Sequence, residues 1–230
     1  MSRVRSEEMR DHLGLYLVMG SVNCRMDPVQ VAEEALAGGV SVLQYREKGR
    51  GALIGDDKKR LGAELQAVCK RHGVPFIVND DLELALELGA DGIHIGQQDE
   101  RADRVRSRIG DLMLGVSAHT VEEAQLAIEQ GADYLGIGPI YPTQSKEDAL
   151  EAQGPSIIGN IRAAGINVPL VGIGGITLAN AGGVMEAGAD GIAVISALTG
   201  ADDIRAAASS FRRLGPESDQ GKRVAGSRQA

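Results

Sequence analysis

At residues 188–196 the sequence reads Gly188-Ala189-Asp190-Gly191-Ile192-Ala193-Val194-Ile195-Ser196, a glycine-alanine-aspartate tripeptide that runs directly into an apolar segment. The same tripeptide precedes an apolar run at 89–91 and 131–133, and a degenerate copy lies at 38–41. Glycine at the end of a helix accepts the left-handed conformation that closes it. Apolar runs without clean alternation are typical of parallel strands buried on both faces. The repeating unit is therefore a helix, a tight turn and a parallel strand.

Eight apolar segments are predicted to be strands, and segments with helical spacing of apolar residues lie between them. The strands are expected at Leu15–Met19, Val42–Arg46, Phe76–Asn79, Gly92–Gly96, Met113–Ser117, Tyr134–Pro139, Leu170–Gly174 and Gly191–Ser196. The helices are expected at Val29–Leu36, Leu61–Val68, Leu82–Leu88, Ala102–Ile109, Val121–Ile128, Ile157–Ala164, Leu178–Ala187 and Ile204–Leu214. Strict alternation predicts a parallel sheet. Eight repeats favour an α/β fold closed into a single (β/α)8 TIM barrel, with an open doubly wound sheet as the alternative.

The bulk composition is that of one globular domain. We expect a barrel over residues 1–214 and a disordered tail over 215–230, because the tail is polar and offers little apolar surface to bury. A formal net charge of −8 argues against a nucleic-acid partner. No run of about eighteen apolar residues exists to cross a membrane, and the N-terminus lacks the apolar stretch of a signal peptide. With only Cys24 and Cys69, the chain reads as a cytoplasmic protein with reduced thiols.

The unusual polar residues follow the predicted strands. In barrels of this kind the active site lies at the C-terminal ends of the strands. The polar residues of this chain collect there, at 44–48, 79–81, 94–99, 117–120, 139–146, 172–175 and Ser196.

Arg46 and Lys48 indicate an anion site. Two residues apart in extended chain, they point to one side, which suits a multiply charged anion. The alternative is an ion pair with a neighbouring acid such as Glu47. Lys146, converging from the end of the sixth strand, favours anion binding.

Asp80 and Asp99 indicate a magnesium site. They end adjacent strands, which run about 5 Å apart, so the two carboxylates can share a divalent cation. A few hard oxygen ligands that leave room for water and a substrate phosphate suit Mg²⁺. The alternative is that aspartate at this junction caps the next helix. We expect Asp81 to be the cap and Asp80 to be the metal ligand.

A second phosphate site is expected after the seventh and eighth strands, the common phosphate-binding loops of this fold. There the run Gly172-Ile173-Gly174-Gly175 leads into a helix, where glycines let backbone N–H groups approach a phosphate, with Ser196 as a co-ligand. Two histidines stay open. For His94, a hydrogen-bonded place inside the barrel is favoured over catalysis, and His119 could be a general base or part of a helix start.

Six motifs in order closely resemble the thiamine phosphate synthase family, from about the first strand to the eighth. They are Gln44-Tyr45-Arg46-Glu47-Lys48, Asn79-Asp80, His94-Ile95-Gly96-Gln97-Gln98-Asp99, Gly115-Val116-Ser117, Gly138-Pro139-Ile140-Tyr141-Pro142-Thr143 and Gly172-Ile173-Gly174-Gly175-Ile176. The family joins 4-amino-5-hydroxymethyl-2-methylpyrimidine diphosphate to 4-methyl-5-(2-phosphoethyl)thiazole and releases diphosphate.

The resemblance implies roles for individual residues. Those implied to bind the pyrimidine diphosphate are Gln44, Tyr45, Arg46, Glu47, Lys48, Asn79, Ser117 and Lys146, of which Arg46, Lys48, Ser117 and Lys146 are the catalytic set. Those implied to contact the thiazole phosphate are Thr143, Gln144, Ser145, Gly174, Ile195 and Ser196. Asp80 and Asp99 would hold one Mg²⁺ per subunit. Serine stands at 145 where the family usually has threonine, and it keeps the hydroxyl.

Other functions remain as alternatives. A thiazole tautomerase on the same barrel would not need the cation cluster and both aspartates. A non-catalytic regulator that binds phosphometabolites would need the glycine loop but no metal pair. An aldolase would want a lysine deep in a strand, whereas Lys48 and Lys146 are expected in loops. The glycines of the loop 49–57 suggest a lid that closes over the site. A homo-oligomer is left open.

Overall fold

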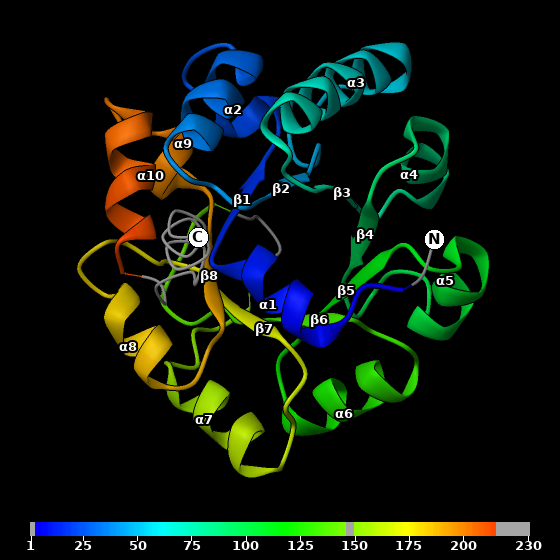
Figure 1. The fold of residues 1–230 in the computed structure, drawn as a ribbon, viewed down its shortest axis with the longest axis vertical. Helices are drawn as coiled ribbons and strands as arrows, with labels where there is room; N and C mark the ends of the chain where they lie inside the picture. Colours follow the sequence, from blue (N-terminus) through cyan, green and yellow to red (C-terminus); the bar gives the residue numbers. More distant parts are fainter. Residues whose placement is uncertain (1–2, 146–149, 215–230) are drawn as a thin grey trace, which may run out of the picture.

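The structure, a computed structural model, describes residues 3–145 and 150–214. Eight parallel strands pair in sequence order, and β8 pairs back to β1, so the sheet closes. Most of the helices surround this ring, and the helix Ser6–Leu13 lies over its centre in this view (Figure 1). The strands are β1 Leu15–Met19, β2 Val42–Tyr45, β3 Phe76–Asn79, β4 Gly92–Ile95, β5 Met113–Ala118, β6 Tyr134–Ile137, β7 Leu170–Ile173 and β8 Gly191–Val194. The predicted (β/α)8 barrel is confirmed, and every predicted strand is present.

The helices differ from the predicted ones in where they begin and end, and some helices were not predicted. They are α1 Ser6–Leu13, η1 Ser21–Asn23, α2 Pro28–Ala37, α3 Gly55–His72, α4 Leu82–Leu88, α5 Ala102–Ile109, α6 Val121–Glu129, α7 Ser156–Ala163, α8 Ala181–Glu186, α9 Ser196–Thr199 and α10 Ile204–Arg212. Helix α3 begins at Gly55, so the last part of the expected lid segment is its first turn. Helices α1, η1 and α9 were not predicted, because the first is mostly charged and the other two are one turn long or less.

The barrel has two apolar layers because side chains alternate along each strand. One set faces outward toward the helices and includes Leu17, Leu43 and Tyr45. The other fills the interior of the barrel and includes Tyr16 and Tyr134. Met9 and Leu13 of α1 join this interior cluster, which explains why a largely charged segment forms an ordered helix.

The three Gly-Ala-Asp repeats stabilise the N-terminal ends of the strands in one shared way. Each aspartate accepts the backbone N–H of the first or second residue of the preceding strand: Asp91 from Phe76, Asp133 from Leu114 and Asp190 from Leu170, each at 2.8 Å. The glycine before it has a positive φ, as at Gly89 (62°), where it closes α4. The predicted turn chemistry is therefore confirmed.

Two arginines complete these repeats. Arg106 of α5 donates to the carbonyls of Gly110, Leu112 and Gly131 and pairs with Asp133. Arg162 of α7 makes the equivalent set of contacts and pairs with Asp190.

The N-terminal segment uses the same aspartates. Arg3 pairs with Asp133 and Arg10 with Asp190, so the helix α1 is fastened across this end of the barrel. The N-terminal end of the barrel is therefore closed by structural side chains, which leaves the opposite end for ligands.

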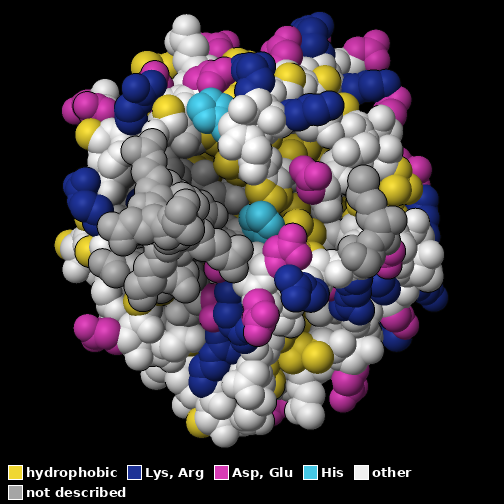
Figure 2. Space-filling view, in the orientation of Figure 1, with side chains coloured by type: hydrophobic (Ala, Val, Ile, Leu, Met, Phe, Trp, Pro, Cys, Tyr) yellow, Lys and Arg dark blue, Asp and Glu magenta, His cyan; other side chains and the backbone are white. Residues whose placement is uncertain are grey.

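The remaining expectations concern the cysteines, membrane-spanning helices, the surface charge and the C-terminal tail. Cys24 and Cys69 are separate thiols. Within residues 3–145 and 150–214, no helix has the length and apolarity needed to cross a membrane. On the face shown in Figure 2, acidic and basic side chains are interspersed rather than gathered into one basic patch. The predicted tail, 215–230, lies outside the described residues.

Candidate active site

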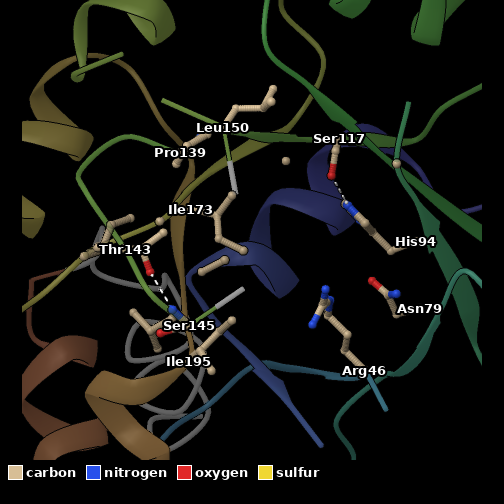
Figure 3. Close-up of a pocket in the computed structure, with 18 of the residues that line it drawn as sticks. Arg46, Asn79, His94, Ser117, Pro139, Thr143, Ser145, Leu150, Ile173 and Ile195 are labelled. Atoms are coloured by element: carbon tan, nitrogen blue, oxygen red, sulfur yellow. Dashed lines mark hydrogen bonds between the residues drawn. The ribbon is translucent and has the colours of Figure 1, made fainter. Parts of the chain in front are cut away.

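A cavity of about 1000 Å³ opens at the C-terminal ends of the strands, where the site was expected (Figure 3). Polar side chains enter it from β2 to β5, and loops after β6, β7 and β8 form the other wall. The predicted site residues that line it are Arg46, Lys48, Asn79, Asp80, Asp99, Ser117, Thr143, Gln144, Ser145, Gly174, Ile195 and Ser196. The structure thus brings together residues spread over 150 positions of sequence.

Gln44, Tyr45 and Glu47 are predicted substrate ligands that do not line the cavity. Tyr45 points outward, stacks on Phe76 with ring centroids 6.3 Å apart, and donates its hydroxyl to the Lys58 carbonyl. Glu47 accepts from the backbone of Ser21 and Leu53, each at 2.8 Å. These two side chains alternate with Gln44, Arg46 and Lys48, so the extended chain turns them away from the barrel axis.

Gln44 lies inside the barrel but below the cavity, where it donates to the Tyr16 hydroxyl. Lys146 lies outside the described residues. Direct contact of Gln44, Tyr45, Glu47 or Lys146 with a substrate stays a prediction.

Asp80 and Asp99 meet at the ends of β3 and β4. Asp80 is the only residue besides glycine with positive φ (62°) among the described residues, a conformation that aspartate tolerates better than most residues. The Asp80 carboxylate accepts from Lys48 Nζ at 2.9 Å, and Asp99 accepts from the Gly96 N–H at 2.7 Å. The two carboxyl groups also lie close enough for each to shift the pKa of the other.

This pairing shifts the pKa values of the two acids in opposite directions. Burial acts to raise the pKa of Asp80, but hydrogen bonds from Asp99 and Lys48 outweigh it, and the pKa is lowered. Burial and the neighbouring Asp80 carboxylate raise the pKa of Asp99. Two carboxylates brought this close favour a cation between them, because a proton or a metal ion relieves their repulsion.

The donor set fits a small hard cation. In the described part of the chain, no group of three or more histidine, cysteine or acidic side chains is placed to hold a metal. Two carboxylates facing an open cavity would leave most coordination positions to water and to substrate phosphate, as Mg²⁺ prefers. Asp81 instead accepts the Leu84 N–H at 3.0 Å and caps α4, which confirms the predicted cap. Asp80 as the metal ligand stays a prediction.

The opposite wall carries hydroxyls and glycines. Ser145 Oγ donates to Ser196 Oγ at 3.1 Å, and Thr143 Oγ1 accepts the Ser145 N–H at 3.2 Å. Gly174 has φ 102°, and a Cβ there would lie 2.7 Å from Pro139, so only glycine fits the close approach of the loops after β6 and β7. The wall is neutral and rich in donors, which suits a phosphate.

The histidines take different positions. His94 is buried inside the barrel and hydrogen-bonds to Tyr134 and Ser117, as the favoured prediction had it, although one edge lines the cavity. His119 also lines the cavity, and its Nδ1 donates to the Gly138 carbonyl at 2.5 Å. Thr120 caps α6 by accepting the Glu123 N–H.

Several lining residues were not predicted: Val22, Asn23, Leu150, Thr177 and Thr199. Thr199, at the end of α9, has a buried Oγ1 without a hydrogen-bond partner in the described structure. Its position five residues after the end of β8 could have suggested it, because the loops after β8 form part of the site in this fold.

Comparisons with known proteins agree with this geometry. A family model described as thiamine monophosphate synthase matches residues 15–198. The thiamine-phosphate synthase of Geobacillus kaustophilus (strain HTA426) is 59% identical over 211 residues, which cover 92% of this chain and 96% of that protein. That of Bacillus cereus (strain B4264) is 54% identical over 217 residues, or 94% and 98% of the two chains. A solved structure of thiamine phosphate pyrophosphorylase from Pyrococcus furiosus has a TM-score of 0.80 and 32% identity and covers 90% of this chain and 96% of that one. The chain therefore belongs to the thiamine monophosphate synthase family.

Proposed function

We propose that this protein joins 4-amino-5-hydroxymethyl-2-methylpyrimidine diphosphate to 4-methyl-5-(2-phosphoethyl)thiazole and releases diphosphate and thiamine phosphate. One observation carries the proposal. A single cavity holds a wall of cations and paired carboxylates from β2 to β4 and a separate wall of hydroxyls and glycines from the loops after β6 to β8. Two anionic substrates require two such walls that face each other.

The charged wall would bind the diphosphate. Arg46 and Lys48 line the same side of the cavity, and Ser117 presents its hydroxyl from β5. Asp80 and Asp99 would hold Mg²⁺, which when bound neutralises charge on the diphosphate. Fixed positive charge and hydrogen-bond donors placed where negative charge develops are usually the largest catalytic contribution. Arg46, Lys48 and Ser117 therefore stabilise the departing group.

The hydroxyl wall would bind the thiazole phosphate. Thr143, Ser145 and Ser196 converge beside Gly174, and the exchange of threonine for serine at 145 keeps the hydroxyl that donates to Ser196. The thiazole nitrogen then faces the pyrimidine methylene carbon. As the carbon–oxygen bond to diphosphate breaks, the methylene carries the positive charge, and the nitrogen lone pair forms the new carbon–nitrogen bond. The reaction needs no protein nucleophile.

The test is diphosphate release from the purified protein, measured with all three components and with the pyrimidine diphosphate, the thiazole phosphate or Mg²⁺ omitted in turn. We expect release only with all three, with stoichiometric thiamine phosphate. Binding of the thiazole phosphate without release would overturn the proposal in favour of a tautomerase or a regulator. We also propose that the protein is cytoplasmic, binds one Mg²⁺ per subunit and can form a homo-oligomer.

The lid also remains a proposal. The Leu53 backbone N–H donates to the Glu47 carboxylate at 2.8 Å, and the neighbouring Ile54 is 81% exposed, so closure would bring an apolar side chain from solvent onto the site. Protection of residues 49–54 from proteolysis when both substrates are added would support closure, and unchanged cleavage would contradict it.

A further inference from the structure

A continuous chain of buried hydrogen bonds crosses the interior of the barrel below the cavity. Gln44 Nε2 donates to the Tyr16 hydroxyl at 2.9 Å, and the Tyr16 and Tyr134 hydroxyls lie 2.7 Å apart. The Tyr134 hydroxyl lies 3.2 Å from His94 Nδ1, and His94 Nε2 lies 3.0 Å from Ser117 Oγ. Figure 3 shows the last link, where His94 points at Ser117 on the cavity wall. The chain thus joins five strands and ends at a predicted substrate ligand.

The chain has one direction of donation. The Gln44 amide nitrogen only donates, so the Tyr16 oxygen accepts, and the Tyr16 proton is directed to Tyr134. The Tyr134 proton then goes to His94 Nδ1, and the His94 proton lies on Nε2 and goes to Ser117. The reverse assignment would leave the buried Tyr16 proton without an acceptor among the described residues, which is unfavourable. Burial raises the pKa of both tyrosine hydroxyls, so each keeps its single proton.

Two glycines in β5 and β6 leave room for this series of hydrogen bonds. A Cβ at Gly115 would lie 2.3 Å from the Tyr134 hydroxyl and 2.4 Å from His94 Nδ1. A Cβ at Gly136 would lie 3.1 Å from His94 Cε1. Neither glycine has a positive φ, so the backbone conformation does not require them. They leave room for the rings, which places the two donors where the hydrogen bonds need them.

We propose that Gln44, Tyr16, Tyr134 and His94 are positioning residues that orient the Ser117 hydroxyl as a hydrogen-bond donor toward the anionic substrate in the cavity. Because Ser117 Oγ accepts the His94 proton, its own proton is directed away from His94 and into the cavity. An ionised phosphate oxygen can only accept, so a hydroxyl proton directed into the cavity matches a diphosphate. The inference rests on the proposed function and extends it from the cavity wall to the interior of the barrel.

Steady-state kinetics of a double-mutant cycle test the coupling. Ser117→Ala is expected to lower kcat/KM for the pyrimidine diphosphate by about tenfold or more, and Tyr134→Phe by about fivefold, with the KM for the thiazole phosphate unchanged. In the Ser117→Ala background, Tyr134→Phe should change kcat/KM by less than about twofold, because the group that it orients is gone. Tyr141→Phe is the matched control, because the Tyr141 hydroxyl donates to the Asn180 carbonyl and takes no part in this series of hydrogen bonds. The variant should retain the parent activity.

If Tyr134→Phe lowers kcat/KM by the same factor in the parent protein and in Ser117→Ala, the proposal is overturned. Removing the hydroxyl of a purely structural tyrosine would lower kcat/KM equally in both backgrounds. Tyr16→Phe breaks the chain one link earlier and serves the same cycle if Tyr134→Phe does not fold. Its loss should also vanish in the Ser117→Ala background.

Nitrogen NMR of the ¹⁵N-histidine-labelled full chain gives a readout independent of activity. Neutral His94 is expected to show a protonated Nε2 and an unprotonated Nδ1, and Tyr134→Phe should shift the population toward the other tautomer. A protonated Nδ1 in the parent protein would overturn the direction of the chain. If the parent releases diphosphate as proposed while the cycle is additive, only this inference fails, and the proposed function stands.

Discussion

Lys48 Nζ donates to Asp80 Oδ2 at 2.9 Å, which joins the predicted diphosphate cation after β2 to the predicted metal ligand after β3. The two groups are the halves of one ion pair, 49% and 24% exposed. Partly exposed pairs of this kind contribute little stability. If Asp80 binds a cation as proposed, the cation would displace the Lys48 ammonium at a small cost in free energy, and the ammonium would then be available to the diphosphate.

The first prediction concerns the carboxylate pair. Asp80→Asn and Asp99→Asn should each lower Mg²⁺-dependent diphosphate release by about a hundredfold or more, because a preorganised charge at the reacting group is removed. Asparagine tolerates the left-handed backbone at 80, so Asp80→Asn should fold. Asp81→Asn is the matched control and should retain turnover. Full Mg²⁺-dependent activity in both variants would exclude the metal site.

The second prediction is a pH dependence at Asp81. Burial acts to raise the pKa of Asp81, but the hydrogen bonds from Lys58 and the Leu84 N–H outweigh it and lower the pKa. A lowered folded pKa contributes stability above the unfolded value of about 3.9, and this is lost as the pH falls through the folded value. Urea unfolding from about pH 7 to about pH 3 should show the wild-type advantage over Asp81→Asn shrinking with acid. A constant difference would be inconsistent with the shift.

The third prediction concerns the arginine that closes one repeat. Arg106→Met should lower the free energy of unfolding by about 3 kcal/mol, because it removes a partner from Asp133, which is only 7% exposed, and donors from three carbonyls. The KM values should not change, since the site is at the other end of the barrel. Arg60→Met, which breaks an exposed pair with Asp57, is the control and should leave the unfolding free energy nearly unchanged. Comparable stability of the two variants would argue against the structural role.

The fourth prediction compares two glycines. Gly115→Ala should destabilise the protein by about 1–3 kcal/mol, because its methyl group would lie 2.2 Å from the Tyr134 ring. Gly159→Ala in α7 has no heavy atom within 4 Å of the new methyl group and should stabilise the protein by up to about 1 kcal/mol. Thermal unfolding of both variants measures the contrast. Tolerance of alanine at 115 would show that the interior can repack around the two rings.

The fifth prediction concerns Thr199. Its buried hydroxyl has no hydrogen-bond partner in the described structure, so Thr199→Val, which keeps the shape, removes a desolvated polar group without breaking a bond. The melting temperature should stay the same or rise. A clear fall would mean that the hydroxyl makes a hydrogen bond in solution.

Much of the site was predictable, because strand ends meet at one end of a barrel whatever the details of packing. That rule places Arg46, Asp80 and Ser117 around one cavity. Alternation along each strand also predicts which side chains face the interior of the barrel and which face outward. Strict alternation through β2 would have separated Tyr45 and Glu47, which point away, from Arg46 and Lys48.

The sequence by itself determined the barrel and the end at which its site lies. Glycine turns and apolar runs are local signals, and eight repeats of them leave few ways to close a sheet. Only the tertiary structure decided that Tyr16 and Tyr134, 118 residues apart, share a hydrogen bond inside the barrel and that α1 is fastened to Asp133 and Asp190. Such contacts depend on strand register and on which side chains share an interior layer, and neither leaves a local pattern in the chain.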